Sequence, residues 1–405
     1  MINEAQALAL LDEVNPVPDL ESYEVEAAEV TPQLTTLVQR SSEMTQLDTR
    51  RANVSPRPKQ PTFWVAAAVV IVLIGAVALL LSQTREVAPA APVAPIPHSS
   101  SSTMSTEGVD ISQLVDVNDW IAYQGPGPDG TAFVFLVHPG GTERHKIGEE
   151  VGASGLPDWS PDGTSVIFTT RGGVTEPLYS YDLATETSSE VFACEDPCVA
   201  DDEPSYSADG SQIVFTRYFG PIVNDLPSDC GLWIGNVDTK QVTQITSNPG
   251  CDKEYAPRLS PDGTTIAYHR YDENGFGKRT AVFLIDVAGG DETQLTDWSI
   301  SAAEPVWSPD GEWLVVSFDP EGIDRSGSDL HRMRPDGSEV EQLTFYETVV
   351  RRPYHPRYTP DGEWIVYSLH SSAGTELWMI PAEGGNPVAL VTGGHFVHPA
   401  WQPTP

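Results

Sequence analysis

The stretch PDWSPDG at residues 157–163, followed by the apolar VIF at 166–168, decides the fold because it recurs along the chain. It returns as PSYSADG at 204–210, PRLSPDG at 257–263, PVWSPDG at 305–311, PRYTPDG at 356–362 and, truncated, PAWQP at 399–403. Successive first prolines are 47, 53, 48, 51 and 43 residues apart. A period near 50 indicates a repeat architecture.

Each repeat has the pattern of four antiparallel strands. In the Ser-Pro-Asp-Gly turn, proline presets φ, aspartate bonds its own backbone and glycine takes the left-handed position. An alternating strand follows, such as residues 164–168, then a third such as 178–181. A fourth, more polar strand ends in threonine, as at 241–246. Four strands with a polar outer edge are typical of a propeller blade.

The two ends of the repeat region complement each other. Residues 119–123, 133–137 and 144–147 have the pattern of second, third and fourth strands without a first, and 399–403 has that of a first strand alone. Joining them removes an exposed sheet edge. We therefore predict an all-β, six-bladed propeller over residues 110–405, closed by the C-terminal strand.

The W-S-P-D-G signature, with Leu-Thr closing the fourth strand, resembles the TolB-like (WD-repeat-like) β-propeller family over about 295 residues, 110–405. The resemblance implies a six-bladed ring used mainly for protein contacts outside the cytoplasm. The family also includes propellers attached to peptidases and some polysaccharide lyases. Ala208 replaces proline and Leu259 replaces the aromatic residue of the signature; neither change threatens the fold.

The chain of 405 residues carries 58 acidic and 22 basic side chains, a net charge of -36. Nucleic-acid binding is therefore excluded, because no surface here neutralises phosphates. From residue 110 onward there are 46 acidic and 16 basic residues, which leaves the ring at -30. This field favours basic partners.

An apolar segment at 63–81 contains 19 residues and no charge. At about 1.5 Å per residue it spans roughly 28 Å, close to the hydrocarbon layer of a bilayer. Basic residues precede it at 50, 51, 57 and 59, and only Arg85 follows before Arg144. The positive-inside rule then predicts a single-pass membrane protein with a cytoplasmic N-terminus and an extracytoplasmic propeller.

The flanking segments have different compositions. Residues 1–60 are acidic and poor in aromatic residues, so we expect a mostly disordered cytoplasmic arm. Apolar residues at 7, 10, 11 and 14 share one helical face, which leaves open a partner-binding helix or a transient one. Residues 15–19 resemble a motif of membrane-anchored proteins, some of which associate with sigma factors. Residues 83–108 form a Pro/Ser-rich linker.

The four cysteines lie on the predicted extracytoplasmic side, where oxidation favours pairing. Cys194 and Cys198 share one loop, and Cys230 and Cys251 bracket the last two strands of one blade. We expect the pairs Cys194–Cys198 and Cys230–Cys251, one of three possible connectivities.

The residue before each repeat proline is expected near the mouth of the central channel. Around the ring these residues are Leu156, Glu203, Ala256, Glu304, His355 and His398. The polar members Glu203, Glu304, His355 and His398 are our candidate ligand-binding residues. Glu304, His355 and His398 lie on successive blades and could bind a divalent metal, but we expect a solvated rim and neither metal nor cofactor.

Motifs of the nucleophile-elbow, zincin and P-loop types are absent from the sequence. We therefore assign no catalytic residue and consider an enzyme less expected than a binding module. The leading hypothesis is a membrane-anchored extracytoplasmic propeller that binds a protein or cell-wall ligand. The alternatives are a channel-mouth glycan lyase or hydrolase, and a transmembrane signalling protein whose arm binds a cytoplasmic regulator such as a sigma factor.

Overall fold

The computed structural model describes residues 110–127, 129–223, 226–249, 254–272, 279–319, 328–346, 351–372 and 374–404. The predicted arm (1–60), membrane helix (63–81) and linker (83–108) lie outside these residues. Within the described ranges, no helix has the length and apolarity needed to cross a bilayer.

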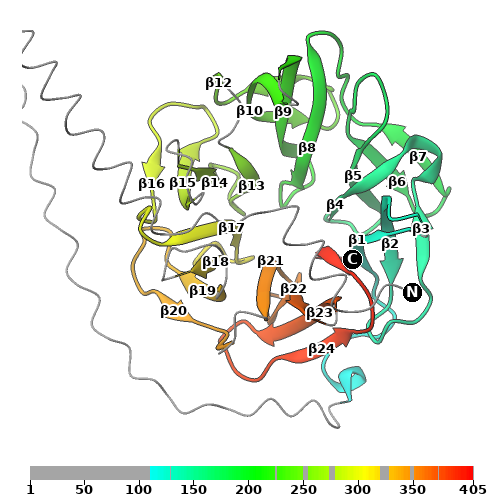
Figure 1. Ribbon diagram of the computed structural model, residues 1–405, viewed down its shortest axis with the longest axis vertical. Helices are drawn as coiled ribbons and strands as arrows, with labels where there is room; N and C mark the ends of the chain where they lie inside the picture. Colours follow the sequence, from blue (N-terminus) through cyan, green and yellow to red (C-terminus); the bar gives the residue numbers. More distant parts are fainter. Residues whose placement is uncertain are drawn as a thin grey trace, which may run out of the picture. The chain divides into compact units, whose positions relative to one another are not determined.

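The described chain forms six antiparallel sheets arranged around a central axis (Figure 1). The first sheet contains β25 (Val397–Trp401), β1 (Ile121–Pro126), β2 (Ala132–Val137) and β3 (His145–Ile147). The second contains β4 (Ala153–Trp159), β5 (Ser165–Thr170), β6 (Tyr179–Asp182) and β7 (Thr187–Glu190). The third contains β8 (Cys198–Tyr206), β9 (Gln212–Val223), β10 (Leu226–Asn236), β11 (Val242–Gln244) and the short β12 (Asn248–Pro249).

The remaining three sheets repeat the same strand order. The fourth contains β13 (Tyr255–Leu259), β14 (Thr265–Tyr271), β15 (Thr280–Asp286) and β16 (Thr293–Gln294). The fifth contains β17 (Ser301–Trp307), β18 (Leu314–Asp319), β19 (Asp329–Met333) and β20 (Glu341–Gln342). The sixth contains β21 (Arg352–Tyr358), β22 (Trp364–Ser371), β23 (Gly374–Pro381) and β24 (Val388–Val391). Two short 3₁₀ helices, η1 (Ile111–Gln113) and η2 (Glu149–Val151), lie in the connections. The predicted six-bladed propeller is confirmed.

The repeated turn joins the first and second strands of a blade. In the second blade the Ser160 hydroxyl donates to the Asp162 carboxylate at 2.6 Å, and the Gly163 amide donates to the Ser160 carbonyl at 2.8 Å. Gly163 has φ 69°, a left-handed conformation that suits glycine. The third blade keeps these contacts although Ala208 replaces proline, because the same serine and aspartate positions make them.

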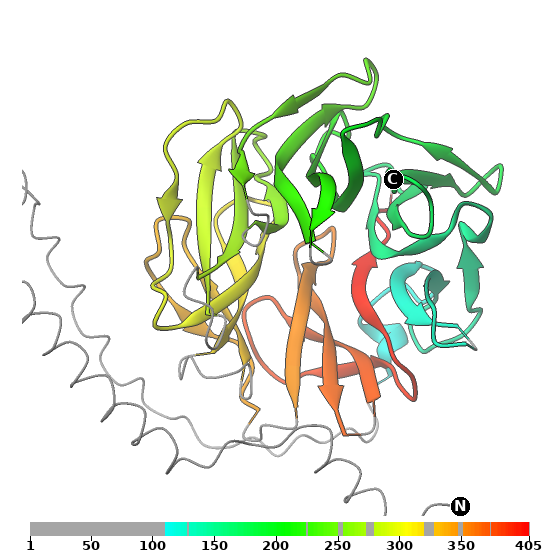
Figure 2. The ribbon, with the colours of Figure 1, turned by 45° about the horizontal axis from the view of Figure 1, so that its top comes forward.

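The C-terminal strand closes the ring, as predicted. β25 pairs antiparallel with β1, with Ile121 opposite Trp401 and Ala122 opposite Ala400. Figures 1 and 2 show this red strand beside the cyan strands of the first blade. The Trp401 indole donates to the Asp119 carboxylate at 2.9 Å. The first blade is therefore assembled from both ends of the repeat region.

The hydrophobic core is divided among the interfaces between blades. Each of six clusters draws its residues from two neighbouring sheets; one, for example, combines Ile121 and Tyr123 of the first blade with Val366 and Met379 of the sixth. The first strand of each sheet lies nearest the central axis (Figure 1). This places the side chains of those strands around the central channel.

Candidate functional site

A bulge in the innermost strand of every blade points one residue toward the axis. The residues involved are those that precede the repeat prolines, and all have φ between 52° and 58°: Leu156, Glu203, Ala256, Glu304, His355 and His398. The pairing register of the strand shifts around this position in each sheet. A bulge reorients the side chain at which it occurs, so the motif sets the direction of these six side chains.

The six bulge residues line one cavity of about 190 Å³. Its other lining residues are Tyr255, Arg258, His269, Tyr271 and Arg357. The structure thus brings all four candidate ligand-binding residues together around one space. Whether they bind a ligand stays a prediction.

The sequence analysis did not predict the other five residues that line this cavity. Arg258 and Arg357 carried a usable signal, because each directly follows a repeat proline and is thus two residues after a bulge residue. Tyr255, His269 and Tyr271 had no local signal, since their approach to the axis depends on how the fourth blade packs against its neighbours.

Side chains at the bulges accept hydrogen bonds from backbone amides of the next blade. The Glu203 carboxylate accepts from the Ala256 amide at 2.6 Å, and the Glu304 carboxylate accepts from the His355 amide at 2.6 Å. The His398 amide lies 3.4 Å from Nδ1 of His355. In the fourth blade, where alanine has no acceptor, His269 Nδ1 instead receives the Glu304 amide at 3.3 Å. These contacts tie successive blades together around the axis.

Glu304 and the two histidines form the polar centre of the cavity. Glu304 Oε1 lies 3.2 Å from His355 Nε2, and Ser317 donates to Oε2 at 3.1 Å. The rings of His355 and His398 stack with centroids 3.5 Å apart. Burial raises the pKa of the Glu304 carboxyl, but the charge and hydrogen bonds of His355 outweigh it, so the pKa lies well below its usual range. Burial lowers the pKa of His398, and the neighbouring His355 lowers it further.

The spacing of possible ligand atoms bears on the metal hypothesis. Among the described residues, the one group of three His, Cys, Asp or Glu ligand atoms within 4.8 Å of one another comprises Cys194, Cys198 and Asp201. Glu304, His355 and His398 do not form such a group. Both sulfurs of the first group are engaged in a disulfide, so they are not available to a metal.

Glu203 lies in a more acidic part of the channel. Burial, followed by the neighbouring Asp202 carboxylate, raises the pKa of Glu203 to about 8. Asp202 forms a 2.8 Å ion pair with Arg171. Glu203 is therefore the carboxyl group of the cavity that holds its proton most readily near neutral pH.

A second pocket of about 350 Å³ adjoins the channel and shares Glu304 and His355 with it. Its other lining residues come from the fourth, fifth and sixth blades and are mostly polar: Thr280, Ser301, Ala303, Ser317, Ser328, Arg352, Tyr354 and His370. We refer to these ten residues as the mouth pocket. Arginine, tyrosine and histidine side chains beside a channel suit a polar ligand with some apolar surface.

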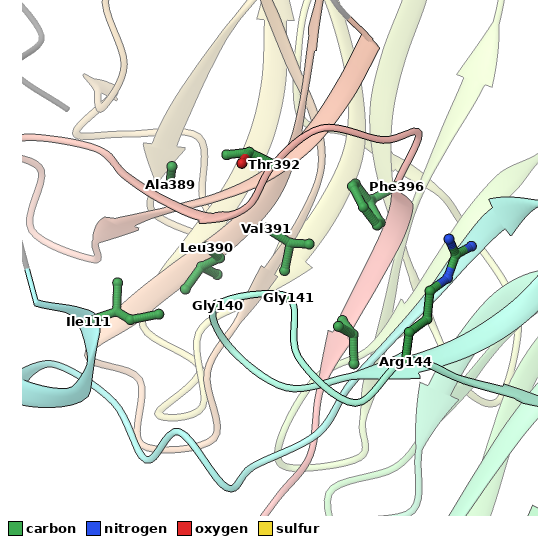
Figure 3. Close-up of a pocket in the computed structure, with 10 residues that line it drawn as sticks. Ile111, Gly140, Gly141, Arg144, Ala389, Leu390, Val391, Thr392 and Phe396 are labelled. Atoms are coloured by element: carbon green, nitrogen blue, oxygen red, sulfur yellow. The ribbon is translucent and has the colours of Figure 1, made fainter. Parts of the chain in front are cut away.

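A third pocket, of about 480 Å³, lies at the seam between the sixth and first blades (Figure 3). Aliphatic residues such as Leu390 line it together with Arg144. The Arg144 guanidinium lies 3.8 Å from the centroid of the Phe135 ring, and the Gly140 amide donates to the Leu390 carbonyl at 2.9 Å. These contacts hold the closing blades together and were not predicted.

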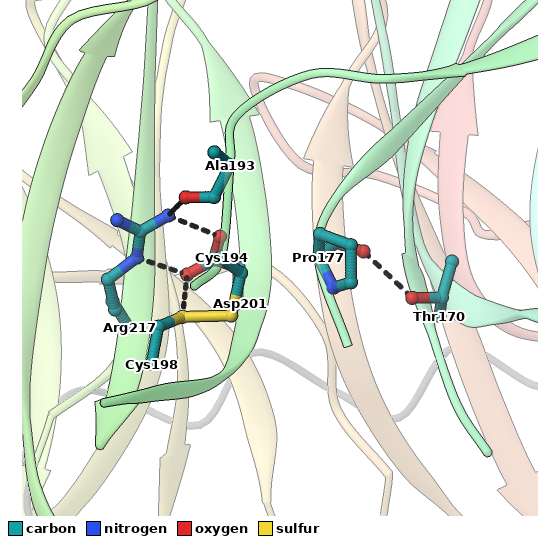
Figure 4. Close-up of a disulfide and its surroundings, with 7 residues drawn as sticks. All are labelled: Thr170, Pro177, Ala193, Cys194, Cys198, Asp201 and Arg217. Atoms are coloured by element: carbon teal, nitrogen blue, oxygen red, sulfur yellow. Dashed lines mark hydrogen bonds and ion pairs between the residues drawn. A yellow bond between two sulfur atoms is a disulfide. The ribbon is translucent and has the colours of Figure 1, made fainter. Parts of the chain in front are cut away.

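The predicted Cys194–Cys198 disulfide is present (Figure 4). Beside it, Arg217 forms a two-point ion pair with the fully buried Asp201, at 2.7 and 2.8 Å. Cys230 is disulfide-bonded as well. Cys251, its predicted partner, lies outside the described residues.

Residues 227–405 match the family model described as PD40, TolB beta propeller domain. The chain contains a TolB-like β-propeller. The matched segment runs from the third blade to the closing strand, and the six-bladed ring extends the same repeat to residue 110.

Two curated relatives are similar to part of the chain. It is 28% identical over 176 residues to the Tol-Pal system protein TolB of Francisella tularensis, covering 43% of this chain and 37% of that protein. It is 25% identical over 200 residues to the uncharacterized peptidase YuxL of Bacillus subtilis, covering 42% and 29% respectively. The chain thus spans about a third of the length of these relatives.

Among solved structures, TolB from Acinetobacter baumannii has the same fold. The TM-score is 0.54 at 21% sequence identity, over 71% of this chain and 67% of that one. At this level of identity the likeness concerns the propeller fold alone.

Proposed function

We propose that this protein is a membrane-anchored, extracytoplasmic propeller that binds a protein or cell-envelope ligand at its channel mouth. The observation that carries the proposal is the mouth pocket. It adjoins the channel through Glu304 and His355, and it presents Arg352, Tyr354 and His370 together. Arginine and tyrosine are enriched where proteins make their strongest contacts with partners.

A binding role fits the channel chemistry better than catalysis. A general base must direct a free lone pair at the proton that it abstracts. The Glu203 and Glu304 carboxylates instead accept backbone amides of the next blade, and Glu304 also contacts His355 and Ser317. These contacts hold both side chains against the neighbouring blades, and this structural role favours the scaffold over the lyase or hydrolase.

Charge indicates the kind of partner. The ring carries 46 acidic and 16 basic residues from residue 110 onward. The negative electrostatic field of the ring would speed the encounter with a basic partner. The same field would repel an anionic polymer. We therefore propose a protein partner with a basic surface.

Membrane anchoring and an extracytoplasmic propeller are parts of the same proposal. The uncharged segment 63–81, with basic residues on its N-terminal side, supports a single-pass anchor with a cytoplasmic N-terminus. The disulfide between Cys194 and Cys198 supports an oxidising compartment for the propeller.

Site-specific photo-crosslinking in the native membrane tests the binding role. A benzophenone amino acid at Tyr354, in the mouth pocket, should give one defined adduct with a cell-envelope protein. The matched control places the same group at Tyr181, on the third strand of the second blade. Arg352→Ala, which removes the guanidinium contact that the pocket offers, should weaken the Tyr354 adduct. No adduct at Tyr354, or equal adducts at both positions, would contradict the proposal.

Anchoring is tested separately by deleting residues 63–81. The full chain should sediment with membranes and resist extraction by carbonate, whereas the deletion variant should stay in the aqueous fraction. A full chain that is released by carbonate would rule out a spanning helix.

A further inference from the structure

Two arginines line the channel cavity at equivalent positions of their repeats. Arg258 follows Pro257 in the fourth blade, and Arg357 follows Pro356 in the sixth. Each donates from Nη1 to the carbonyl of its own proline, at 2.7 and 2.9 Å. The two guanidinium groups are therefore held in place by the same local contact on either side of the fifth blade.

The Nε donors of both arginines are buried and have no hydrogen-bond partner among the described residues. Arg258 is only 8% exposed. Neither side chain has a carboxylate oxygen within 4.0 Å in the described ranges. A buried, unsatisfied donor on a charged group is costly. Arg270 also leaves its Nε unpaired, but its Nη2 contacts the Glu254 and Glu292 carboxylates, whereas Arg258 and Arg357 have no such contact in the described ranges.

Other buried arginines of the propeller are neutralised by direct contact. Arg217, Arg270 and Arg332 have side chains 6%, 19% and 8% exposed, and each contacts a carboxylate at 3.0 Å or less. The chain thus provides close acidic partners for arginines elsewhere. Arg258 and Arg357 differ because they face a cavity.

The carboxylates near Arg258 are directed elsewhere. Asp158, Glu203 and Glu304 interact with its charge through space. Each, however, accepts a backbone amide of the following blade: from Tyr206 at 2.9 Å, from Ala256 at 2.6 Å and from His355 at 2.6 Å. These acceptor oxygens are directed at backbone amides, which leaves the arginine donors available.

We propose that the channel cavity binds a small oxyanion through the N–H groups that Arg258 and Arg357 do not use on their own repeats. The planar guanidinium presents paired donors that match phosphate and carboxylate oxygens alike. A cavity of about 190 Å³ has room for such a group together with water. The oxyanion is either a free ion, such as phosphate, or a carboxylate of a docked chain.

Thermal unfolding of the full-length protein in detergent tests the site. Sodium phosphate or sodium acetate replaces sodium chloride at constant ionic strength. At about a hundred times its dissociation constant, a bound anion should raise Tm by about 3–6 °C, in a saturable way. A rise with phosphate alone assigns a free anion, and a rise with acetate assigns carboxylate recognition; no saturable rise with either overturns the proposal.

Matched variants locate the effect. Arg258→Gln and Arg357→Gln should each abolish the anion-dependent rise in Tm. Arg334→Gln removes an arginine that is paired on the surface with Glu312 and Glu339, and it should keep the full rise. An unchanged rise in both channel variants would overturn the proposal.

A direct measurement on the unmodified protein covers the case in which a channel variant fails to fold. Crystals of the full-length protein soaked in selenate should show an anomalous peak beside Arg258 and Arg357. Absence of the peak, or peaks only on the outer surface, would overturn the assignment. The site goes beyond the partner proposed above, and its failure would leave the Tyr354 crosslinking result unaffected.

Discussion

At the scale of single residues, the channel acids act as connectors between blades. Glu304 contacts three partners, the His355 ring, the His355 amide and Ser317, and it lies against the stacked His355 and His398 rings. A buried carboxylate with several partners stabilises the fold only while all of them are present, because each unpaired group then bears the cost of burial.

Glu304→Gln should lower the free energy of unfolding by about 2–3 kcal/mol, because it removes the charge that faces His355. Denaturant unfolding monitored by tryptophan fluorescence measures this loss. Glu312→Gln, on the surface beside Arg334, is the control and should leave the unfolding midpoint unchanged. Equal midpoints for the two variants would show that Glu304 does not join the blades.

Glu203 makes the stability of the ring depend on pH. Its pKa is raised from 4.5 to about 8 in the folded protein, mainly by burial. Below pH 4.5 the group is protonated in both states, so its contribution is fully present. As the pH rises toward 8, the unfolded chain releases the proton and the folded chain does not. The contribution of Glu203 to the free energy of unfolding is therefore lost over this range.

Glu203→Gln should therefore gain stability relative to the wild type as the pH is raised from 4.5 to 8.5. The measurement is the difference in unfolding free energy between variant and wild type at these two pH values. Glu363→Gln, on an exposed turn, should show no such trend. A constant difference for Glu203→Gln would mean that Glu203 is ionised in the folded ring.

At the scale of elements, the repeated bulge determines what reaches the axis. A left-handed residue before proline interrupts each inner strand, and it costs non-glycine residues about 1 kcal/mol or more. The chain keeps this conformation in all six blades and uses it to direct side chains and amides between neighbours.

Ala256→Gly should change stability by less than about 0.5 kcal/mol, since relief of the left-handed strain offsets the loss of a methyl group. The matched change Ala267→Gly, at a fully buried position of β14, relieves no such strain and should cost about 1–2 kcal/mol. Chemical denaturation of both variants measures the contrast. Similar losses at the two positions would show that the bulge is not strained.

At the scale of the whole molecule, ring closure involves more than the pairing of β25 with β1. The tail beyond β25 reaches the second blade, where the Gln402 side chain donates to the Gly163 carbonyl at 2.8 Å. The Trp159 indole of the second blade donates to the Ala400 carbonyl at 3.0 Å. The closing segment thus contacts the second blade as well as β1 of the first.

Gly163→Ala tests this closure. An added Cβ would lie 2.2 Å from the Pro403 carbonyl oxygen, whereas at the equivalent Gly263 it would meet nothing within 4 Å. Both glycines have a positive φ, so Gly263→Ala should cost about 1 kcal/mol from backbone strain alone. Gly163→Ala should lower Tm further, because the tail must move. Equal Tm values would mean that the tail does not rest on this turn.

Much of the site could be predicted from sequence, since its geometry is local. The proline motif identified all six bulge residues around the cavity, and the four-residue separation of Cys194 and Cys198 identified their disulfide. The arginine donors could not be predicted, because whether Arg258 has a partner depends on where Asp158 and Glu203 direct their oxygens.

The sequence by itself determined the number of blades, the order of strands and the strand that closes the ring, because turns and strand alternation act between near neighbours along the chain. Only the tertiary structure decided which amide each channel side chain reaches and which donors remain free. Those contacts join residues about 50 positions apart, such as Glu304 and His355, and they form only when all six sheets are packed into the closed ring.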